Sequence, residues 1–477
     1  MAHTLSILAP KPTSTRLWQA GGLLAALVLS VVVLNYTLPR DKTVGGEMLG
    51  HDFLAFYTAG TVARTGDVEH LYSLSYADTF QHEIGRWFDL DLSPTSFGPY
   101  WNPPFYSLLF APLTALPYPY ALAVWTAINL MCAIAACWLL CRMVARASHP
   151  WPIYESQSLG EFLQPWRYWA LVPLLLFLSM PFIQAMSHGQ NTCISLLLLT
   201  ATVTFWRNQR PLLAGLMCGL LFYKPQLAAI VAAMLTLTMG WRALAGIGLV
   251  GLTMLGTQEL FLPGSTALFL QQLPLNLKTM QIDSAYLWER HVTLKAFWRL
   301  LLQGREPGEI SPVALCAWVG TSVLLCIGLI AAIRNTWRTK LDDPFGGHTR
   351  AVQRDRIIAA SIATMPLLMP FYFDYDLLLL AVPLTLVAVE RLRRPDERVH
   401  AHDRLLTLVM AGLYLWLLVN PGLARASGVN ASVAFLAAVA GLLINRACRE
   451  HVSATVGQEE IEALPKYHLP QPMRTAA

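Results

Sequence analysis

The sequence is poor in charged residues for a chain of its length. Only 13% of its 477 residues are Asp, Glu, Lys or Arg, whereas soluble proteins carry about 25%. With 55% hydrophobic residues and a mean hydropathy of +0.46, the chain has too much apolar side chain for one water-soluble core. The short alternating segments of barrel strands are missing. These features predict an all-α, polytopic integral membrane protein with about 10–13 transmembrane helices.

Other absences exclude whole classes of function. The sequence has no Walker A loop and no HExxH motif, so it shows no recognisable site for ATP hydrolysis or zinc proteolysis. No basic stripe with interleaved aromatics indicates a nucleic-acid partner. The eight cysteines lie in or near apolar runs and show neither a disulfide framework nor zinc-ligand spacing. We expect no cofactor and no metal, and interpret Asp89-Leu90-Asp91 as part of an ordinary loop.

Lysine and arginine placement sets the expected orientation, because cytoplasmic loops of membrane proteins are enriched in them. With the N-terminus inside, 23 of the 34 Lys and Arg residues fall in cytoplasmic segments. This assignment divides the chain into a cytoplasmic N-terminus (1–16), a transmembrane domain (17–446) with exterior loops at 39–103 and 263–310, and a cytoplasmic, disordered tail (447–477). We therefore expect a multi-pass protein of the cell inner (plasma) membrane, with both termini cytoplasmic and the active site on the periplasmic or extracellular side.

Long apolar runs place the helices, the first of them as an uncleaved signal anchor. They are expected near 17–38, 119–141, 168–186, 191–206, 211–223, 225–240, 243–262, 311–333, 357–373, 375–390, 404–420 and 430–446. The apolar piece Phe105–Leu116 is too short to cross and is expected to be re-entrant or interfacial. Residues 68–87 are expected to form one or two short amphipathic helices on the membrane surface.

Asp52 is the residue on which we expect the chemistry to depend. It lies just past the first apolar run, in the first exterior loop. As a carboxylate at a membrane surface it either caps a short helix or carries out chemistry. Its aromatic neighbours Phe53, Phe56 and Tyr57 can form a partly apolar wall, which raises the pKa of Asp52 toward the range of a general base.

The segment Ser187–Asn191 forms a tight exterior turn between two apolar runs. Gly189 supplies the turn conformation, so the segment can be a simple helix hairpin. Polar residues of this density at a membrane mouth also bind sugars or phosphates, and both interpretations stay open.

Lys224 is the only charged residue between Pro211 and Gly240. Pro225 breaks the helix directly after it. A snorkelling lysine is one interpretation. A broken helix with a cation at the break is also how membrane proteins hold anionic groups, and we favour binding because an unpartnered lysine in apolar surroundings is costly.

Two later exterior segments carry charge. Trp288–His291 reads as a solvated loop with a salt bridge, yet Arg290 has the fork geometry that suits a phosphate. In Phe371–Asp376, Asp374 and Asp376 are either helix-start carboxylates or groups that position an acceptor hydroxyl.

Four of these stretches together resemble a known family. They are Asp52–Tyr57, Pro103–Tyr106, His188–Asn191, and Ala214-Gly215 followed by Tyr223–Pro225. Over roughly residues 17–390 the chain resembles glycosyltransferase family 87. These are polytopic GT-C type enzymes, similar to the polyprenyl-phosphomannose-dependent mannosyltransferases.

The resemblance implies a GT-C type helix bundle whose first non-cytoplasmic loop carries short interfacial helices. It implies transfer of mannose, or another hexose or pentose, from a polyprenyl-phosphate donor to a glycolipid or glycan acceptor, with inversion and with Asp52 as the general base. Donor phosphate binding is assigned to Lys224, Arg290 and His188. Substrate binding is assigned to Gln190, Asn191, Tyr57, His291, Asp374 and Asp376. Membrane lipid, lipid-linked donor and acceptor are the expected partners. A flippase for a lipid-linked sugar and a non-catalytic envelope assembly subunit are the alternatives.

Overall fold

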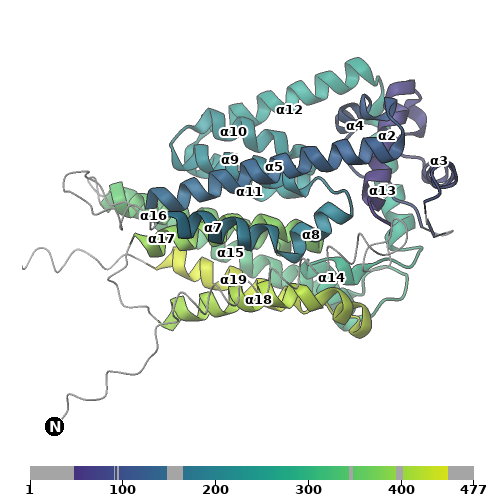
Figure 1. Ribbon diagram of the computed structural model, residues 1–477. Coiled ribbons are helices and arrows are strands. Elements are labelled where there is room, and N and C mark those ends of the chain that lie inside the picture. Colours follow the sequence, from purple (N-terminus) through teal and green to yellow (C-terminus); the bar gives the residue numbers. More distant parts are fainter. Residues whose placement is uncertain are drawn as a thin grey trace, which may run out of the picture.

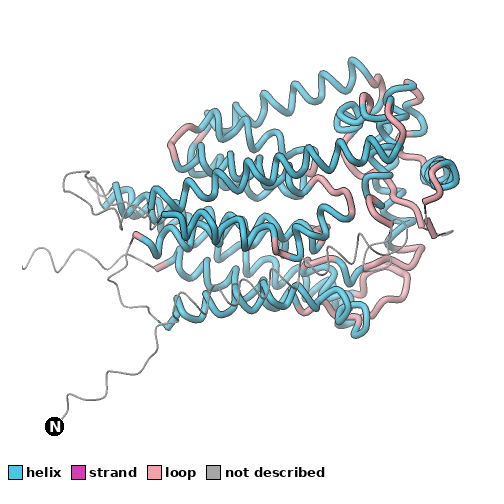
Figure 2. Tube along the Cα trace, viewed as in Figure 1, coloured by secondary structure: helices cyan, strands magenta, loops and turns pink. Residues whose placement is uncertain are grey.

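The computed structural model describes residues 48–90, 92–93, 96–147, 165–342, 347–393 and 401–449 (Figures 1 and 2). The expected cytoplasmic N-terminus, the anchor at 17–38 and the tail beyond residue 449 lie outside this part of the chain. Within it, every regular element is a helix and no strand forms. The all-α prediction is therefore confirmed.

The α-helices gather into a bundle, with α2, α3, α4 and α13 at one end of it (right in Figure 1). The elements are α2 (His51–Thr65), η1 (Val68–His70), α3 (Leu74–Trp87), α4 (Pro104–Phe110), η2 (Leu113–Ala115), α5 (Tyr118–Ala147), α7 (Pro165–Phe177), α8 (Met180–Ser187), α9 (Thr192–Arg207), α10 (Pro211–Leu220), η3 (Leu221–Tyr223), α11 (Pro225–Met239), α12 (Trp241–Phe261), α13 (Ser265–Gln281), η4 (Trp288–Arg290), α14 (Leu294–Leu302), α15 (Pro312–Asp342), α16 (Gly347–Leu368), η5 (Asp374–Leu380), α17 (Ala381–Leu392), α18 (Ala401–Ser427) and α19 (Ser432–Cys448).

Several of these helices are built to cross a membrane. Four described helices are long and apolar enough: Tyr118–Arg146, Trp241–Phe261, Pro312–Asn335 and Ala401–Ser427. The pair α7 and α8, bent by 55°, makes a fifth if it counts as one span. The other apolar runs of the sequence appear as shorter apolar helices, because prolines and glycines divide them. The whole is a polytopic membrane helix bundle.

The two long segments that we expected as exterior loops are mostly helical. The segment 263–310 contains the 17-residue helix α13, which no apolar run of the sequence predicts. Polar side chains such as Gln271, Gln272 and Asn276 lower its hydropathy, so a search for apolar runs misses it. Within 39–103 the expected amphipathic helix is present as α3. The short piece after residue 104 forms α4 and a 3₁₀ turn.

Glycines let α10 and α12 pack closely. A Cβ on Gly246 would lie 2.5 Å from the carbonyl oxygen of Leu212. Gly246, Gly248 and Gly251 also match the G-x-G-x-x-G spacing of dinucleotide-binding turns. That turn must follow a strand and open a helix, whereas these three lie inside α12. Gly246 therefore serves helix packing.

The other end of the bundle carries buried ion pairs between α9, α16 and α17. Arg207 lies 3.0 Å from Asp355, and Arg356 lies 2.6 Å from Glu390. Arg207 ends α9, whereas the turn that opens α9 lies at the first end of the bundle. Cations expected on the cytoplasmic side thus gather far from α2.

Candidate active site

The start of α2 is clamped to the turn between α8 and α9. The backbone N–H of Asp52 donates to the carbonyl of His188 over 3.0 Å. Gly189 has a φ of +69°, and a Cβ there would lie 2.8 Å from Cβ of Phe53, so the turn requires glycine. The indole of Trp125 donates to the Gly189 carbonyl over 2.8 Å. Two motifs more than 130 residues apart therefore meet at the Asp52 carboxylate.

Polar groups surround the Asp52 side chain, which is 24% exposed. The Gln190 amide donates to Oδ2 over 2.8 Å. Nδ1 of His188 lies 3.7 Å from Oδ2, and Nδ1 of His51 lies 3.5 Å from Oδ1. The other ring nitrogen of His51 shares a 2.9 Å hydrogen bond with Ser96. A carboxylate flanked by two imidazoles can accept a proton and can also pass it on.

These neighbours set the direction of the Asp52 pKa. Burial raises the pKa, but a hydrogen bond from His51 and the charges of His188, His51 and Arg290 outweigh it, so that the pKa is lowered. The carboxyl also lies in the first turn of a helix, where the dipole favours the anion. Asp52 is therefore ionised throughout the neutral range.

Of the three aromatic neighbours only Phe56 lines the cavity beside Asp52, and the predicted rise in the pKa of Asp52 is wrong. Phe53, Phe56 and Tyr57 are buried in a cluster with the rings of α4 and α5. Tyr57 donates its hydroxyl to the carbonyl of Leu116 over 2.8 Å, away from the carboxylate. Phe53 and Tyr57 turn toward the core, whereas Phe56, four residues after Asp52, lies on the same helix face as the carboxylate and lines the cavity with it.

Lys224 has a partner. It lies at the break between η3 and α11, where Pro225 starts the next helix. Its Nζ is 3.1 Å from Oδ1 of Asp376, and Lys224 and Asp376 are only 7% and 2% exposed. The hydroxyl of Thr192 donates to the same carboxylate oxygen over 2.8 Å. A buried ion pair of this geometry offsets the free-energy cost of placing a charged lysine in apolar surroundings.

The remaining motif residues support the backbone beside Lys224. The rings of Tyr106 and Tyr223 stack with centroids 4.5 Å apart. The Asn191 amide donates to the Tyr106 hydroxyl over 3.0 Å, and Tyr223 donates to the Asn191 carbonyl over 3.2 Å. The Asn102 amide donates to the Tyr223 carbonyl over 2.7 Å. Three segments are thereby joined behind the lysine.

Arg290 approaches from η4. Its guanidinium lies 3.8 Å from Oδ1 of Asp374, at the start of η5. The Gln184 amide donates to the other oxygen of Asp374 over 3.1 Å. Arg290 is 21% exposed, against 5% for Asp374. The arginine therefore reaches the cavity while its carboxylate stays in the wall.

His291 is fully buried beside Arg290. Its Nε2 shares a 2.9 Å hydrogen bond with the Tyr286 hydroxyl, and its backbone forms an antiparallel bridge with Phe373. Burial, together with the charges of Arg290 and Lys295, lowers the pKa of His291 to about 3. The imidazole is neutral and joins η4 to the segment before η5.

One cavity of about 460 Å³ collects these groups. Of the residues predicted for the site, its lining includes Asp52, Gln190, Lys224, Arg290 and Asp376. The others lie behind the wall: Tyr57, His188, Asn191, His291 and Asp374. Sequence reasoning missed the lining residues His51, Ser96, Tyr286 and Tyr375. Only His51 and Tyr375 had a signal, because each lies next to a candidate aspartate.

Within the described residues, one group of side chains has the spacing of metal ligands. Asp67, Glu69 and His70 hold ligand atoms within 4.8 Å of one another on η1. They do not line the cavity, and the Asp67–His70 pair is more than a third exposed. Exposed acidic groups of this kind are common without an ion, so the cluster has no part in the site.

The family match rests on the middle of the chain. The model of glycosyltransferase family 87 matches residues 100–301. This range holds the motifs at 103–106, 188–191 and 223–225 and begins after Asp52. Neither the curated proteins nor the solved structures yield a match. The matched range, the motifs within it and the membrane helix bundle make the chain similar to the membrane glycosyltransferases of family 87.

Proposed function

We propose that the protein transfers a sugar from a polyprenyl-phosphate donor to a hydroxyl of a glycolipid or glycan acceptor, on the non-cytoplasmic side of the inner (plasma) membrane. The proposal is supported above all by one observation: Asp52, Lys224 and Arg290 line one cavity at one end of an apolar bundle. A lipid-borne donor can reach such a site with its chain in the bilayer. A proton acceptor and two cations are the groups that the transfer needs.

The reaction is a single displacement. The acceptor O–H gives its proton to the Asp52 carboxylate while its oxygen forms a bond to the anomeric carbon. The bond between that carbon and the phosphate oxygen breaks, and its electron pair leaves with the lipid phosphate. Attack opposite to the leaving group inverts the configuration. Phosphate is a good leaving group, so no general acid is needed.

The lowered pKa of Asp52 keeps the carboxylate ionised for the first half of this step but makes it a weak base. An ionised carboxylate is ready to accept a proton at any neutral pH, although its low basicity makes the proton transfer late. His51 and His188 lie within 4 Å of the carboxylate and favour its anionic form. The Gln190 amide fixes its orientation.

The cations serve the second half. Charge develops on the phosphate oxygens as the bond breaks, and preorganised donors lower that barrier. Lys224 and Arg290 are held by Asp376 and Asp374, so their positions are set before the donor arrives. An ammonium has three donors and a guanidinium has five, which leaves capacity for the phosphate.

The test is Asp52→Asn in purified protein, with a polyprenyl-phosphate sugar and a lipid acceptor. Transfer is expected to fall by about 10²–10⁴-fold, the usual contribution of a general base, while donor binding persists. Asp78→Asn is the matched control, because that aspartate is 49% exposed and does not line the cavity. Unchanged turnover of Asp52→Asn would remove Asp52 as the base. Transport without transfer in proteoliposomes would favour a flippase.

A further inference from the structure

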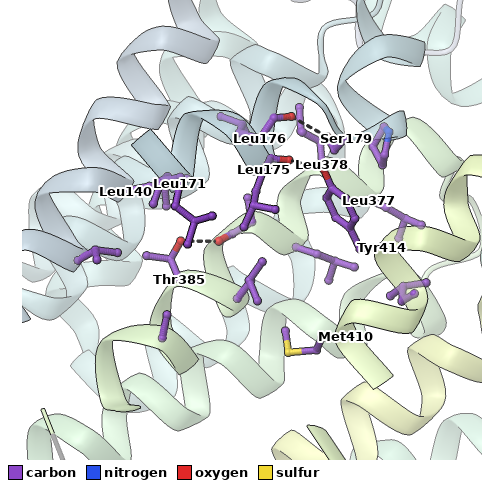
Figure 3. Close-up of a pocket in the computed structure, with 18 of the residues that line it drawn as sticks. Leu140, Leu171, Leu175, Leu176, Ser179, Leu377, Leu378, Thr385, Met410 and Tyr414 are labelled. Carbon is purple, nitrogen blue, oxygen red and sulfur yellow. Dashed lines mark hydrogen bonds between the residues drawn. The ribbon is translucent and has the colours of Figure 1, made fainter. Parts of the chain in front are cut away.

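A second cavity of about 370 Å³ (Figure 3) shares no lining residue with the reaction cavity. Most of its lining residues come from α7, α17 and α18, and the others from α5, α8, α19 and η5. The separating element is η5, which gives Asp376 to the reaction cavity and Leu377 and Leu378 to this groove. The groove is therefore a different site.

The groove walls offer hydrocarbon and almost no hydrogen-bonding capacity. Three of its lining residues carry hydroxyls, and each hydroxyl donates to a backbone carbonyl. Ser179 donates to Leu176 over 2.7 Å, Thr385 to Ala381 over 2.7 Å, and Tyr414 to Leu175 over 2.9 Å. A sugar or nucleotide would lose its hydration here without compensation. A hydrocarbon chain makes no hydrogen bonds to water and would therefore lose none on binding here.

The groove has the length and the opening of a lipid site. The stretch from Leu377 to Leu392 lines one side. Its four 3₁₀ residues at ~2 Å each and its twelve α-helical residues at ~1.5 Å each span roughly 26 Å, close to a hydrocarbon core of ~30 Å. Leu171 and Leu384 on its rim are 41% and 37% exposed. A chain from the surrounding bilayer can enter sideways between them.

One end of the groove is cationic. Arg391 is the single charged residue in its lining, at the C-terminal end of α17. Two residues further on, Arg393 joins Arg207 and Arg354 around the one carboxylate of Asp355, at 3.9, 3.0 and 3.2 Å. Three guanidiniums against one carboxylate leave positive charge at the same end of α17 as Arg391. This charge is complementary to an anionic lipid headgroup.

We propose that the groove binds one acyl chain of an anionic phospholipid, with its phosphate against Arg391. The chain fills the hydrocarbon walls between α7, α17 and α18, and the headgroup lies at the arginine-rich end of the bundle. The site does not depend on the sugar-transfer chemistry, because none of its lining residues takes part in the proposed reaction.

The experiment is native mass spectrometry of the full-length protein, released from micelles that hold phosphatidylglycerol or phosphatidylcholine with identical acyl chains. The wild type is expected to retain phosphatidylglycerol in preference. The Arg391→Gln variant is expected to retain about fivefold less phosphatidylglycerol than the wild type, which is the effect of one basic residue near an anionic lipid. Leu384→Trp fills the groove and is expected to lose both lipids. Leu408→Trp is the matched control, because Leu408 lies on α18, is 69% exposed and does not line the groove.

Three results would overturn the proposal. The first is equal retention of the two lipids by the wild type. The second is an Arg391→Gln variant that keeps the preference unchanged; this variant tests the headgroup even if Leu384→Trp does not fold. The third is displacement of phosphatidylglycerol by polyprenyl phosphate at equimolar concentration, which would assign the groove to the sugar donor. Loss of transfer in Asp52→Asn has no bearing on any of them.

Discussion

The buried pair of Lys224 and Asp376 allows a quantitative test of how the site is held together. The two groups lie 3.1 Å apart and are 7% and 2% exposed. At an effective dielectric constant of about 20, charges at this separation attract by ~5 kcal/mol, and part of that offsets the cost of burying them. Removing one partner leaves the other buried and unpaired, which costs ~3–5 kcal/mol. We therefore expect Asp376→Asn to destabilise the protein by about that amount.

The assay is a double-mutant cycle. Unfolding is followed by circular dichroism in mixed micelles titrated with SDS, for the wild type, Asp376→Asn, Lys224→Met and the double variant. The double variant removes both charges, while the amide introduced by Asp376→Asn keeps an oxygen for the Thr192 hydroxyl. The loss in unfolding free energy of the double variant is expected to be ~2–3 kcal/mol smaller than the sum of the losses in the two single variants. Asp78→Asn, at an exposed pair with His82, is expected to cost less than ~1 kcal/mol.

Additive single changes, within ~0.5 kcal/mol, would refute this reasoning, because they would mean that the two charges do not stabilise each other. Donor binding separates structure from function in the same set. A double variant that is as stable as the wild type but binds a polyprenyl-phosphate sugar weakly would place Lys224 in the phosphate site. Unchanged donor binding would make the pair purely structural.

Two further predictions concern the walls of the site. His291 has a pKa of about 3 when folded, against ~6.5 when unfolded, so the unfolded chain binds the extra proton between these values and stability is lost as pH falls from 6.5 toward 3. His291→Gln should flatten the profile of unfolding free energy against pH by up to ~1.4 kcal/mol per unit in that window; parallel profiles would contradict this. Gly189→Ala must hold a φ of +69° and meet Phe53, so it should cost at least ~1–2 kcal/mol and slow transfer. The control Gly248→Ala, in a helix with open space around it, should gain ~0.5–1 kcal/mol, and equal effects of the two changes on the unfolding midpoint would be evidence against the turn requirement.

Much of the fold follows from local rules. A backbone in lipid must satisfy its own hydrogen bonds, so long apolar runs become helices. Prolines mark where helices begin, as Pro211 and Pro225 do. The rule does not detect a polar helix, so α13 was not predicted from the sequence.

Part of the candidate site could also be predicted from motifs in the sequence. The stretches at 188–191 and 223–225 fall inside the matched family range. They predict Gln190 and Lys224 as site residues from the sequence alone. Both residues line the reaction cavity. Residue type and spacing suffice here because a broken helix or a polar turn in apolar surroundings is a local feature.

Partners and protonation were decided by the tertiary structure alone. Nothing in the sequence says that Lys224 pairs with a carboxylate 152 residues away, or that His188 lies beside Asp52. The sequence alone gave the pKa shift of Asp52 the wrong sign, because burial does raise the pKa but the histidines and Arg290 beside the carboxylate outweigh it. Apolar periodicity is a local property of a few helical turns of sequence, whereas charge pairing depends on which distant segments the packed bundle brings together.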